Sequence, residues 1–467
     1  MDAKHKANVE QLSTRIKDFY KHNVPFRVYH GSTNATRVKT YKRSEMADVS
    51  NLNRVLSVDA ERRVVLAEPN VSMEKLLKAT LKHGLMPPVV PEFPGITVGG
   101  AIQGGAIESG SFRYGAFGQT VQSMEMVLGN GEVVSVTPDE RADLFYATAG
   151  SYGSLGLITA AEIQLIPAKK YVQITTTPVS SIQEGVELTK KYAQTSCDFI
   201  ECFIFAKNSG GLNIGKLSDS VKGKLRHFDR AHDNYYYLHI EDIIQSKKTT
   251  VFTVTLKDYL FRFDRGAFWA AQAAFEHLGL AFNRFTRFIL NSRLHTRTLY
   301  KVVQATAAAQ QFVCQDIVLP GNGVASFMNY IYDTFGEFPS GWVAVKTEPK
   351  SKLQFNAMPD TDLVFNVGVY GPRIREYEKF VEVNRDIEHE VNKHHGRKWF
   401  YAHSYYTKEE FWNIYDKKWY ELIRNKYHAT RLPNIYDRIQ TKKQHIKDPK
   451  KVALKVMFGA DKPMVKD

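Results

Sequence analysis

Cysteine is scarce in this sequence, and the few cysteines present exclude its common structural uses. The 467 residues include only Cys197, Cys202 and Cys314. The spacing of the first two fits neither a CxxC redox pair nor a zinc site, so we expect buried thiols in a reducing compartment. His394 and His395 do not predict a metal either, because adjacent side chains on a helix point in different directions. The sequence predicts no metal.

Long hydrophobic runs are also missing. No apolar run reaches the ~18–20 residues that a membrane-spanning helix needs. Residues 1–15 lack the hydrophobic core of a signal peptide. We therefore expect a cytoplasmic protein, either in the cytosol or on a membrane surface facing it.

The overall composition is that of a folded protein with excess positive charge. Hydrophobic residues make up 43% and charged residues 24%, which is typical of globular proteins. At ~100–200 residues per domain, the length predicts two or three units. The net charge of +14 fits nucleic acid, an anionic membrane or simply a basic surface. No nucleic-acid-binding motif is present, whereas eight lysines against three aspartates from Ile439 onward favour acidic lipid. We expect no nucleic-acid partner and allow peripheral membrane contact.

The first third of the chain has clear strand and helix signals. Residues 55–70 predict a strand, a turn and a strand. Ser72 is expected to cap an amphipathic helix that stops at Gly84. Strands are predicted again at 124–136, with a hairpin at 129–131, and at 155–167.

The composition changes after Pro167, which predicts a second unit from about residue 169. Within it, residues 258–295 are rich in aromatic residues, leucine and arginine. Two interpretations stay open: a core-facing helix pair, or an apolar cavity wall or membrane-facing lip. The apolar residues at helical spacing are Trp269, Phe275, Leu278 and Phe282, and the interleaved arginines are Arg262, Arg265, Arg284 and Arg287.

A glycine-rich stretch at residues 97–105, TVGGAIQGG, is the first candidate site. A pyrophosphate must be met by backbone N–H groups, and glycines let the chain approach closely. The stretch has no GxGxxG between a strand and a helix, so it is not a Rossmann fingerprint. Alone it could be merely a turn.

The segments around it sharpen the interpretation. Residues 91–121, then GNGEVVSV at 129–136, then residues 143–167 resemble, in order, the FAD-binding domain of the vanillyl alcohol oxidase and p-cresol methylhydroxylase family. That family's earlier phosphate loop is matched by residues 26–34. The resemblance implies that FAD contacts Gly31, Ser32, Thr33, Asn34, Thr97, Val98, Gly99, Gly100, Gln103, Gly104, Gly105, Ser109, Tyr114, Gly115, Gly153, Gly156 and Ile158.

Within that family, the chain is most similar to the Δ24-sterol reductases. The shared segments are AEPNVSM at 67–73, IPAKKYV at 166–172, QDIVLP at 315–320, VGVYGPR at 367–373 and FYAHSYYTKEEFW at 400–412. The chain departs from these reductases at Pro94 and Gly95, in residues 338–345, and at His403, which replaces an acidic residue.

The resemblance implies an α+β fold: a two-lobed FAD-binding domain of the vanillyl-alcohol-oxidase type with an α+β cap domain. The expected divisions are 1–168 for the FAD-binding domain, 169–395 for the cap, and 396–467 for a segment returning to the FAD domain. Flavin-attaching relatives have a histidine where Thr33 stands, so non-covalent FAD is expected. His30 lies three residues earlier.

Two enzyme activities remain open, together with a non-catalytic basic binding protein. A reductase would take electrons from NADPH or NADH through FAD to an isolated carbon–carbon double bond of a sterol or other apolar molecule. An oxidase or dehydrogenase would take hydride from an alcohol-type substrate. The oligomeric state is not predicted.

Alkene reduction also requires a positioned acid. The segment 403–410 supplies Tyr405 and His403 as candidate catalytic residues. Only Tyr405 matches the sterol-reductase signature. The alternative for Tyr405 is an ordinary buried phenol with a satisfied hydroxyl.

Overall fold

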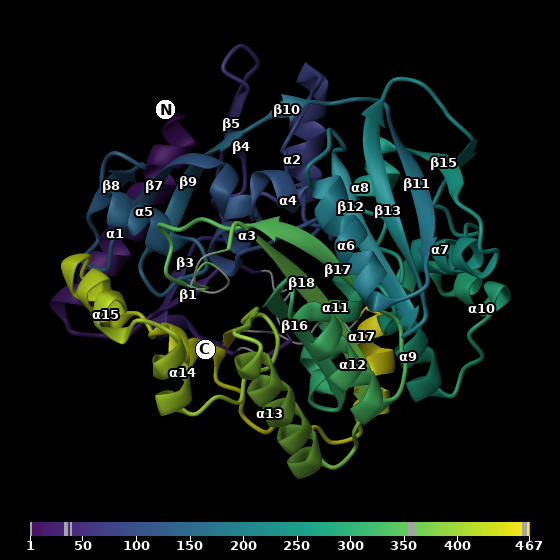
Figure 1. Ribbon diagram of the computed structural model, residues 1–467. Helices are drawn as coiled ribbons and strands as arrows, with labels where there is room; N and C mark the ends of the chain where they lie inside the picture. The colour runs from purple at the N-terminus through teal and green to yellow at the C-terminus, as the bar shows by residue number, and fades with distance from the viewer. Residues whose placement is uncertain are drawn as a thin grey trace.

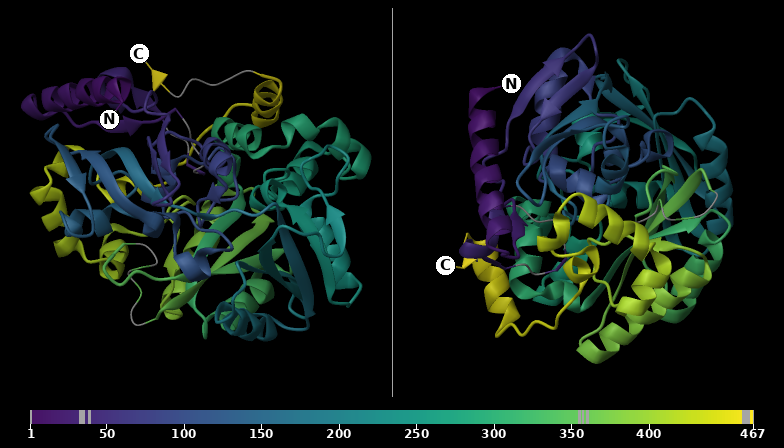
Figure 2. Two further views of the ribbon diagram at one scale, coloured as in Figure 1. Left: turned by 90° about the horizontal axis from the view of Figure 1, so that it is seen from above. Right: turned by 90° about the vertical axis from the view of Figure 1, so that its left-hand side faces the viewer.

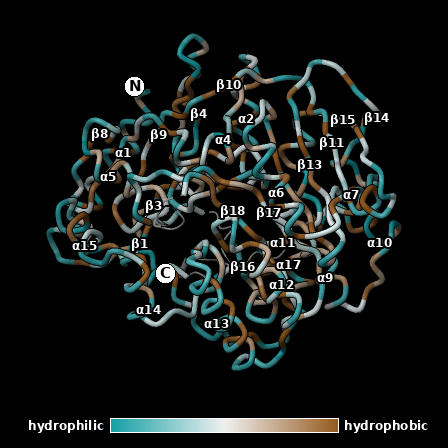
Figure 3. The backbone as a smooth tube through the Cα atoms, viewed as in Figure 1, coloured by the Kyte–Doolittle hydropathy of each residue, from teal (hydrophilic) through white to brown (hydrophobic). Residues whose placement is uncertain are grey.

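A computed structural model describes residues 2–31, 36–37, 40–353, 356, 358, 361–459 and 465–466. Two separate sheets organise these residues, with helices packed against both (Figure 1). This confirms the predicted α+β class. In Figure 3 hydrophobic segments run through the interior strands, and hydrophilic segments lie mostly in the outer loops.

The first sheet has five antiparallel strands in the order β4-β5-β9-β7-β8. The predicted hairpin at 129–131 connects β7 and β8, where Gly131 has φ +85°. The strands are β4 (Val55–Asp59), β5 (Val64–Ala67), β7 (Val121–Val127), β8 (Val133–Val136) and β9 (Leu157–Gln164). The helices of this region are α1 (Ala3–Lys21), α2 (Met73–Thr80), α3 (Val98–Gly104), α4 (Ser111–Tyr114) and α5 (Ala142–Thr148).

The predicted helix after Ser72 is present as α2. The Ser72 side chain accepts a hydrogen bond from the Lys75 backbone N–H, and the chain leaves the following 3₁₀ turn through Gly84, which has φ +68°. Short strand pairs tie nearby segments together. They are β1 (Arg27–Tyr29) with β3 (Met46–Asp48), β2 (Tyr41–Lys42) with β20 (Val465–Lys466), and β6 (Leu85–Met86) with β10 (Ile166–Pro167).

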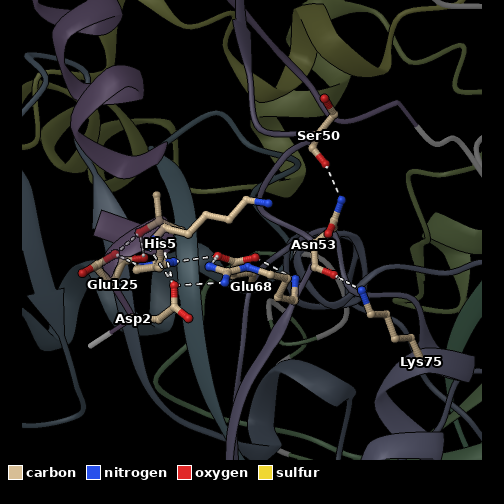
Figure 4. Close-up of polar contacts among 10 residues, drawn as sticks. Asp2, His5, Ser50, Asn53, Glu68, Lys75 and Glu125 are labelled. Carbon is tan, nitrogen blue, oxygen red and sulfur yellow. Dashed lines mark hydrogen bonds and ion pairs between the residues drawn. The ribbon is translucent and has the colours of Figure 1, made fainter. Parts of the chain in front are cut away.

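A buried histidine of helix α1 forms hydrogen bonds with residues of the five-stranded sheet region (Figure 4). His5 Nδ1 lies 2.9 Å from Glu68 Oε1, and its Nε2 lies 2.9 Å from Glu125 Oε1. Asp2 caps the helix and pairs with Arg54 at 2.9 Å. Because His5 is fully buried, these contacts replace the water that its ring nitrogens lose on folding.

The second sheet has nine strands in the order β14-β15-β11-β13-β12-β17-β18-β16-β19. It begins at Tyr171, just after β10, and we propose residue 168 as the domain boundary on this basis. Its strands are β11 (Tyr171–Val179), β12 (Phe199–Ala206), β13 (Ser209–Ser218), β14 (Lys224–Arg226), β15 (Thr250–Thr255), β16 (Phe312–Pro320), β17 (Ser340–Lys346), β18 (Leu363–Arg373) and β19 (Arg397–Lys398).

Helices cover both faces of this sheet. In β12, Phe199 and Phe203 pack toward one core cluster, whereas Ile200 and Cys202 pack toward another, as the period of two requires. The Cys202 side carries α6 (Ile182–Ala193), α12 (Val324–Phe335) and α13 (Tyr377–Lys393). The Phe199 side shares its core with the five-stranded sheet and carries α7 (Tyr236–Gln245), α8 (Leu256–Leu260) and α9 (Ala270–Leu278). Helices α10 (Arg284–Ile289) and α11 (Thr296–Thr306) follow.

The last part of the chain contacts both regions. Tyr420 Oη lies 2.8 Å from Ser154 Oγ, and Arg424 donates to the Ser154 carbonyl at 2.6 Å. Farther on, α17 packs on α11. The yellow α17 and the teal-green helices beside it lie on the same side of the molecule (Figure 2, left). The helices are α14 (Lys408–Ile414), α15 (Lys417–Lys426), α16 (Ile435–Ile439) and α17 (Pro449–Met457).

Within the part of the chain that the structure describes, no helix combines the length and apolar character needed to cross a bilayer.

Candidate active site

The glycine-rich stretch at 97–105 forms a short helix, α3, rather than an open loop. Thr97 caps it and accepts a hydrogen bond from the Gly100 backbone N–H at 3.3 Å, and Gly105 ends it with φ +70°. The helix forms because Thr97 is a good N-cap and because Ala101 and Ile102 bury their side chains in the core. The predicted row of free backbone donors is therefore corrected: only part of the stretch is available to a ligand.

One large cavity opens beside this helix, with a volume of about 460 Å³. Of the residues that the sequence assigned to the cofactor, Thr97, Gly100, Gln103 and Gly104 line it. A Cβ built on Gly104 meets no atom within 4 Å, and one on Gly100 meets only Thr97 Oγ1, at 2.9 Å. These two glycines thus present bare backbone to open space, which fits close approach of a ligand.

An arginine from the C-terminal part of the chain faces the same cavity. Arg438 of α16 lines the cavity wall, and burial together with nearby Arg27 and Arg424 lowers its pKa. Among the described residues, no carboxylate forms an ion pair with Arg438. A Cβ built on Gly153, which has φ +70°, would lie 3.7 Å from Arg438 Nη2. This cationic group beside a glycine wall fits an anionic ligand such as a pyrophosphate.

A group of polar side chains lies on the wall formed by the nine-stranded sheet. Tyr401 Oη donates a hydrogen bond to Asp316 Oδ2 at 2.6 Å, and Asn366 Nδ2 lies 3.4 Å from Asp316 Oδ1. Strand alternation places Asp316 there: in β16, Ile317 and Leu319 pack in the core with α12 and α13, so Asp316 faces the cavity.

Two carboxyl groups that line the cavity hold protons more tightly than usual. Burial raises the pKa of Asp316 to about 6, against the opposing hydrogen bonds from Tyr401, Asn366 and Tyr370. Burial also raises the pKa of Glu92 to about 8, and the charge of Glu108 adds to this effect. The pocket therefore contains acids that can carry a proton near neutral pH.

The rest of the cavity is strongly apolar. Trp269 and Phe275, which the sequence placed in a helical segment of two possible roles, line the cavity and also belong to the buried core, so both interpretations apply to them. The other large apolar residues of the wall include Phe93, Ile96, Ile107, Phe268, Leu280, Leu290, Leu294, Leu299, Val302, Val303, Phe312, Val313, Trp399 and Met457. The site thus combines a buried cationic group beside two exposed glycines, a small polar group and an extensive apolar wall.

Several known proteins are similar in sequence to this chain. The profile of the FAD binding domain family matches residues 6–137. The Delta(24)-sterol reductase of Mus musculus is 29% identical over 423 residues, covering 88% of this chain and 81% of that protein. The Delta(24)-sterol reductase of Arabidopsis thaliana is 26% identical over 431 residues, covering 83% and 75%. A Decaprenylphosphoryl-beta-D-ribose oxidase of Mycolicibacterium smegmatis is 41% identical over 123 residues, covering 26% and 27%.

The protein is an FAD-dependent oxidoreductase. The cavity of this flavoenzyme fits the cofactor, because backbone without side chains and a buried cation lie at one end and an apolar wall extends from them. We propose that Thr97, Gly100, Gln103, Gly104 and Arg438 hold FAD.

The flavoenzyme uses several other predicted cofactor residues for packing. A Cβ on Gly99 would lie 2.8 Å from Pro69 Cβ, and one on Gly156 would lie 2.9 Å from Met126 Cε, so both glycines allow close packing. Ser109 bonds Tyr259 Oη at 3.0 Å. The other predicted residues that are absent from the described cavity wall are Gly31, Val98, Gly105, Tyr114, Gly115, Gly153 and Ile158.

The structure describes only part of the earlier phosphate loop, residues 26–34. Ser32, Thr33 and Asn34 lie outside the described residues. Thr36 Oγ1 donates to the Tyr401 carbonyl at 3.1 Å, and the Arg37 guanidinium donates to the carbonyls of Phe400 and Ala402. These bonds hold Thr36 and Arg37 against the segment that carries Tyr401. His30 lines the cavity.

The two catalytic candidates chosen from the sequence require correction. Neither His403 nor Tyr405 belongs to the described cavity wall. Burial, with Arg37 and Lys398 nearby, lowers the pKa of His403 to about 3, so its imidazole is neutral and a poor acid. The ring of Tyr405 packs on Phe380, with ring centroids 6.2 Å apart.

Sequence reasoning missed Asp316, Tyr401 and Arg438. A signal was present for the first two: Asp316 interrupts the apolar segment QDIVLP, and Tyr401 lies in the aromatic signature at 400–412. Arg438 lies in the short helix α16, between the buried Ile435 and Ile439, and gave no such signal.

Proposed function

We propose that this protein is an FAD-dependent reductase that saturates an isolated carbon–carbon double bond of a sterol or similar apolar molecule, with NADPH or NADH as electron donor. The observation that most supports this proposal is the Asp316–Tyr401 pair on the wall of a largely apolar cavity. The same cavity adjoins the glycine-rich helix α3. Similarity to sterol reductases over most of the chain supports the same reaction.

The apolar wall would select the substrate. A hydrocarbon skeleton gains about 25 cal/mol for each Å² of apolar surface that the cavity removes from water. The few polar groups would then orient it. The departures at Pro94 and Gly95 lie beside Phe93, which lines the cavity, so they would adjust substrate choice within this class.

Tyr401 is the proposed proton donor. When bound, FAD supplies the two-electron hydride chemistry. The proton would pass from Tyr401 Oη to one alkene carbon as hydride reaches the other, so that one π bond breaks and two C–H bonds form. Asp316, when protonated, would restore the Tyr401 proton through their hydrogen bond, and solvent would then reprotonate Asp316.

We also propose non-covalent FAD and a cytoplasmic location with peripheral membrane contact. All three cysteines are free thiols, which fits a reducing compartment.

Anaerobic mixing tests the reaction. NADPH or NADH should bleach the flavin absorption band, and a sterol with a side-chain double bond should restore it without oxygen. Absence of bleaching by either nucleotide would contradict the proposal.

An oxidase or dehydrogenase of an alcohol-type substrate is the second candidate. The matched segment of the ribose oxidase favours it, and an ionised Asp316 could accept a proton from a hydroxyl. Bleaching by an alcohol, with no response to nucleotide, would support this alternative.

A further inference from the structure

Helix α10 exposes its apolar side chains and buries a charged one. Phe285 is 71%, Phe288 53% and Ile289 58% exposed. Their i, i+3 and i+4 positions put them on one face. Arg287 instead is buried, with its guanidinium carbon 5.0 Å from the Phe282 ring centroid. This pattern is the reverse of that expected for a helix that faces water.

A second apolar group lies next to this helix. In and just after α17, Leu454 is 47% and Phe458 64% exposed. Arg293, in the 3₁₀ turn that follows α10, lies with its guanidinium carbon 5.3 Å from the Phe458 ring centroid. Helix α17 also packs on α11, the helix that follows this turn in the chain. We call the resulting surface the apolar rim; its members are Leu280, Phe285, Phe288, Ile289, Leu454 and Phe458.

The apolar rim borders the cavity. Leu280 lines the cavity and is 44% exposed. Leu290 and Met457 also line it, and each is the immediate neighbour of a rim residue, Ile289 and Phe458 respectively. The rim therefore adjoins the apolar part of the cavity wall.

Positive charge surrounds the rim. From residue 279 to residue 301 the sequence has no acidic residue; besides the buried Arg287 it has Arg284, Arg293, Arg297 and Lys301, of which Arg297 pairs with Glu74 at 3.1 Å. On α17, Lys450, Lys451 and Lys455 are exposed, with Asp448 as the nearby acid. Exposed aromatic and aliphatic side chains among cations match the boundary between acyl chains and anionic headgroups.

We propose that the apolar rim inserts into the headgroup layer of an anionic bilayer, with the cavity mouth against the membrane. A second copy of the chain fits the rim less well, because a twofold contact would place the same basic surface against itself. The connection to substrate entry rests on the proposed function, whereas membrane binding rests only on the exposed surface.

Vesicle sedimentation with the full-length holoprotein tests this docking. We expect binding to vesicles of phosphatidylcholine and phosphatidylglycerol in equal amounts, weaker binding to phosphatidylcholine alone, and loss of binding as salt rises. The double variant Phe285→Ser/Phe288→Ser should bind the acidic vesicles roughly tenfold less, or weaker still, because two inserted aromatic side chains are lost.

Leu422→Ser is the matched control, because Leu422 of α15 is 61% exposed and is not a rim residue. It should leave vesicle binding unchanged, and all variants should retain the wild-type flavin content and unfolding temperature. Unchanged binding of the double variant would overturn the proposal, as would equal binding to neutral and acidic vesicles. Concentration-dependent self-association that the double variant abolishes, without vesicle binding, would instead assign the rim to a second copy.

The assay is independent of turnover. A protein that binds acidic vesicles through the rim but reduces no alkene would refute the proposed function and leave the docking surface intact. A protein that reduces a detergent-dispersed sterol but binds no vesicles would refute the docking surface and leave the proposed function intact.

Discussion

The hydroxyl of Tyr401 lies 2.6 Å from Asp316 Oδ2, on the wall of a largely apolar cavity. The two residues are 85 positions apart in sequence, and their pairing depends on β16 and the segment after β19 meeting in the folded chain. A phenol bonded to a carboxyl group whose pKa is about 6 can donate a proton and regain it.

Tyr401→Phe should slow alkene reduction. We expect alkene-driven reoxidation of the reduced flavin to slow by ~10²–10⁴-fold, the usual cost of a lost acid. Flavin content and reduction by nucleotide should stay unchanged, which stopped-flow absorbance measures separately. Tyr405→Phe is the comparison, because Tyr405 is absent from the described cavity wall. A large effect of Tyr405→Phe with none for Tyr401→Phe would restore the sequence-based candidate.

Asp316→Asn should alter the pH dependence of both rate and stability. The pKa of Asp316 is about 6 in the folded protein, against 3.8 for an ordinary aspartate. Folding therefore favours the protonated form, and the wild-type protein loses folding stability as pH rises through about 6. Asp316→Asn lacks this loss. The free energy of unfolding of the variant relative to that of the wild type should therefore be larger at pH ~8 than at pH ~3, by at most about 3 kcal/mol. Urea unfolding at both values measures it.

The reoxidation rate should fall as pH rises through about 6 in the wild type, since Asp316 then loses its proton. Asp316→Asn should lack this inflection. Glu92→Gln controls for the second cavity acid, whose pKa is about 8. An inflection near pH ~6 that persists in Asp316→Asn would assign it to another group.

Gly104→Val should expel FAD without unfolding the protein. A Cβ at Gly104 meets no atom within 4 Å, so the new side chain would occupy cavity space rather than strike the protein. Gly100→Val should also lose FAD, but with lower stability, because its Cβ would lie 2.9 Å from the capping Thr97 Oγ1. The ratio of flavin to protein absorbance and the unfolding temperature measure the two effects. Full flavin occupancy in Gly104→Val would show that the helix is not part of the cofactor site.

Arg438→Met should weaken FAD binding roughly 10- to 100-fold, the loss expected for a charged hydrogen bond. The flavin-free protein should become more stable, because burial and neighbouring arginines already disfavour this charge. Titration calorimetry with FAD and thermal unfolding without it measure the two changes. The exposed Arg375→Met is the control. Equal FAD affinity in the two variants would remove Arg438 from the site.

Acid precipitation should release the yellow colour into the supernatant, because FAD is expected to be held without a covalent bond. His30→Ala is the parallel variant, because His30 lines the cavity. Colour retained in the wild-type pellet but released from His30→Ala would demonstrate a covalent link through His30 and contradict the prediction.

Local features were predictable because their causes are local. The Ser72 cap, the Gly84 stop and the 129–131 hairpin depend on backbone preferences of a few adjacent residues, and the structure contains all three. The α+β class and FAD dependence also followed from the sequence, because several ordered motifs marked the flavin domain. The helical form of 97–105 was missed because its glycines concealed the Thr97 cap and the buried Ala101 and Ile102.

Only the tertiary structure decided which groups share the active site. The sequence alone identified the cofactor class, the Gly100 and Gly104 wall, and the aromatic segment around Trp269. It did not bring Asp316, Tyr401 and Arg438 to one cavity, because strand order in the nine-stranded sheet and the return of the C-terminal segment determine that meeting. Nearness in sequence instead suggested His403 and Tyr405, whose rings both lie against Phe380 and not on the described cavity wall. Contacts between distant residues carry no period or spacing, so only the folded chain reveals them.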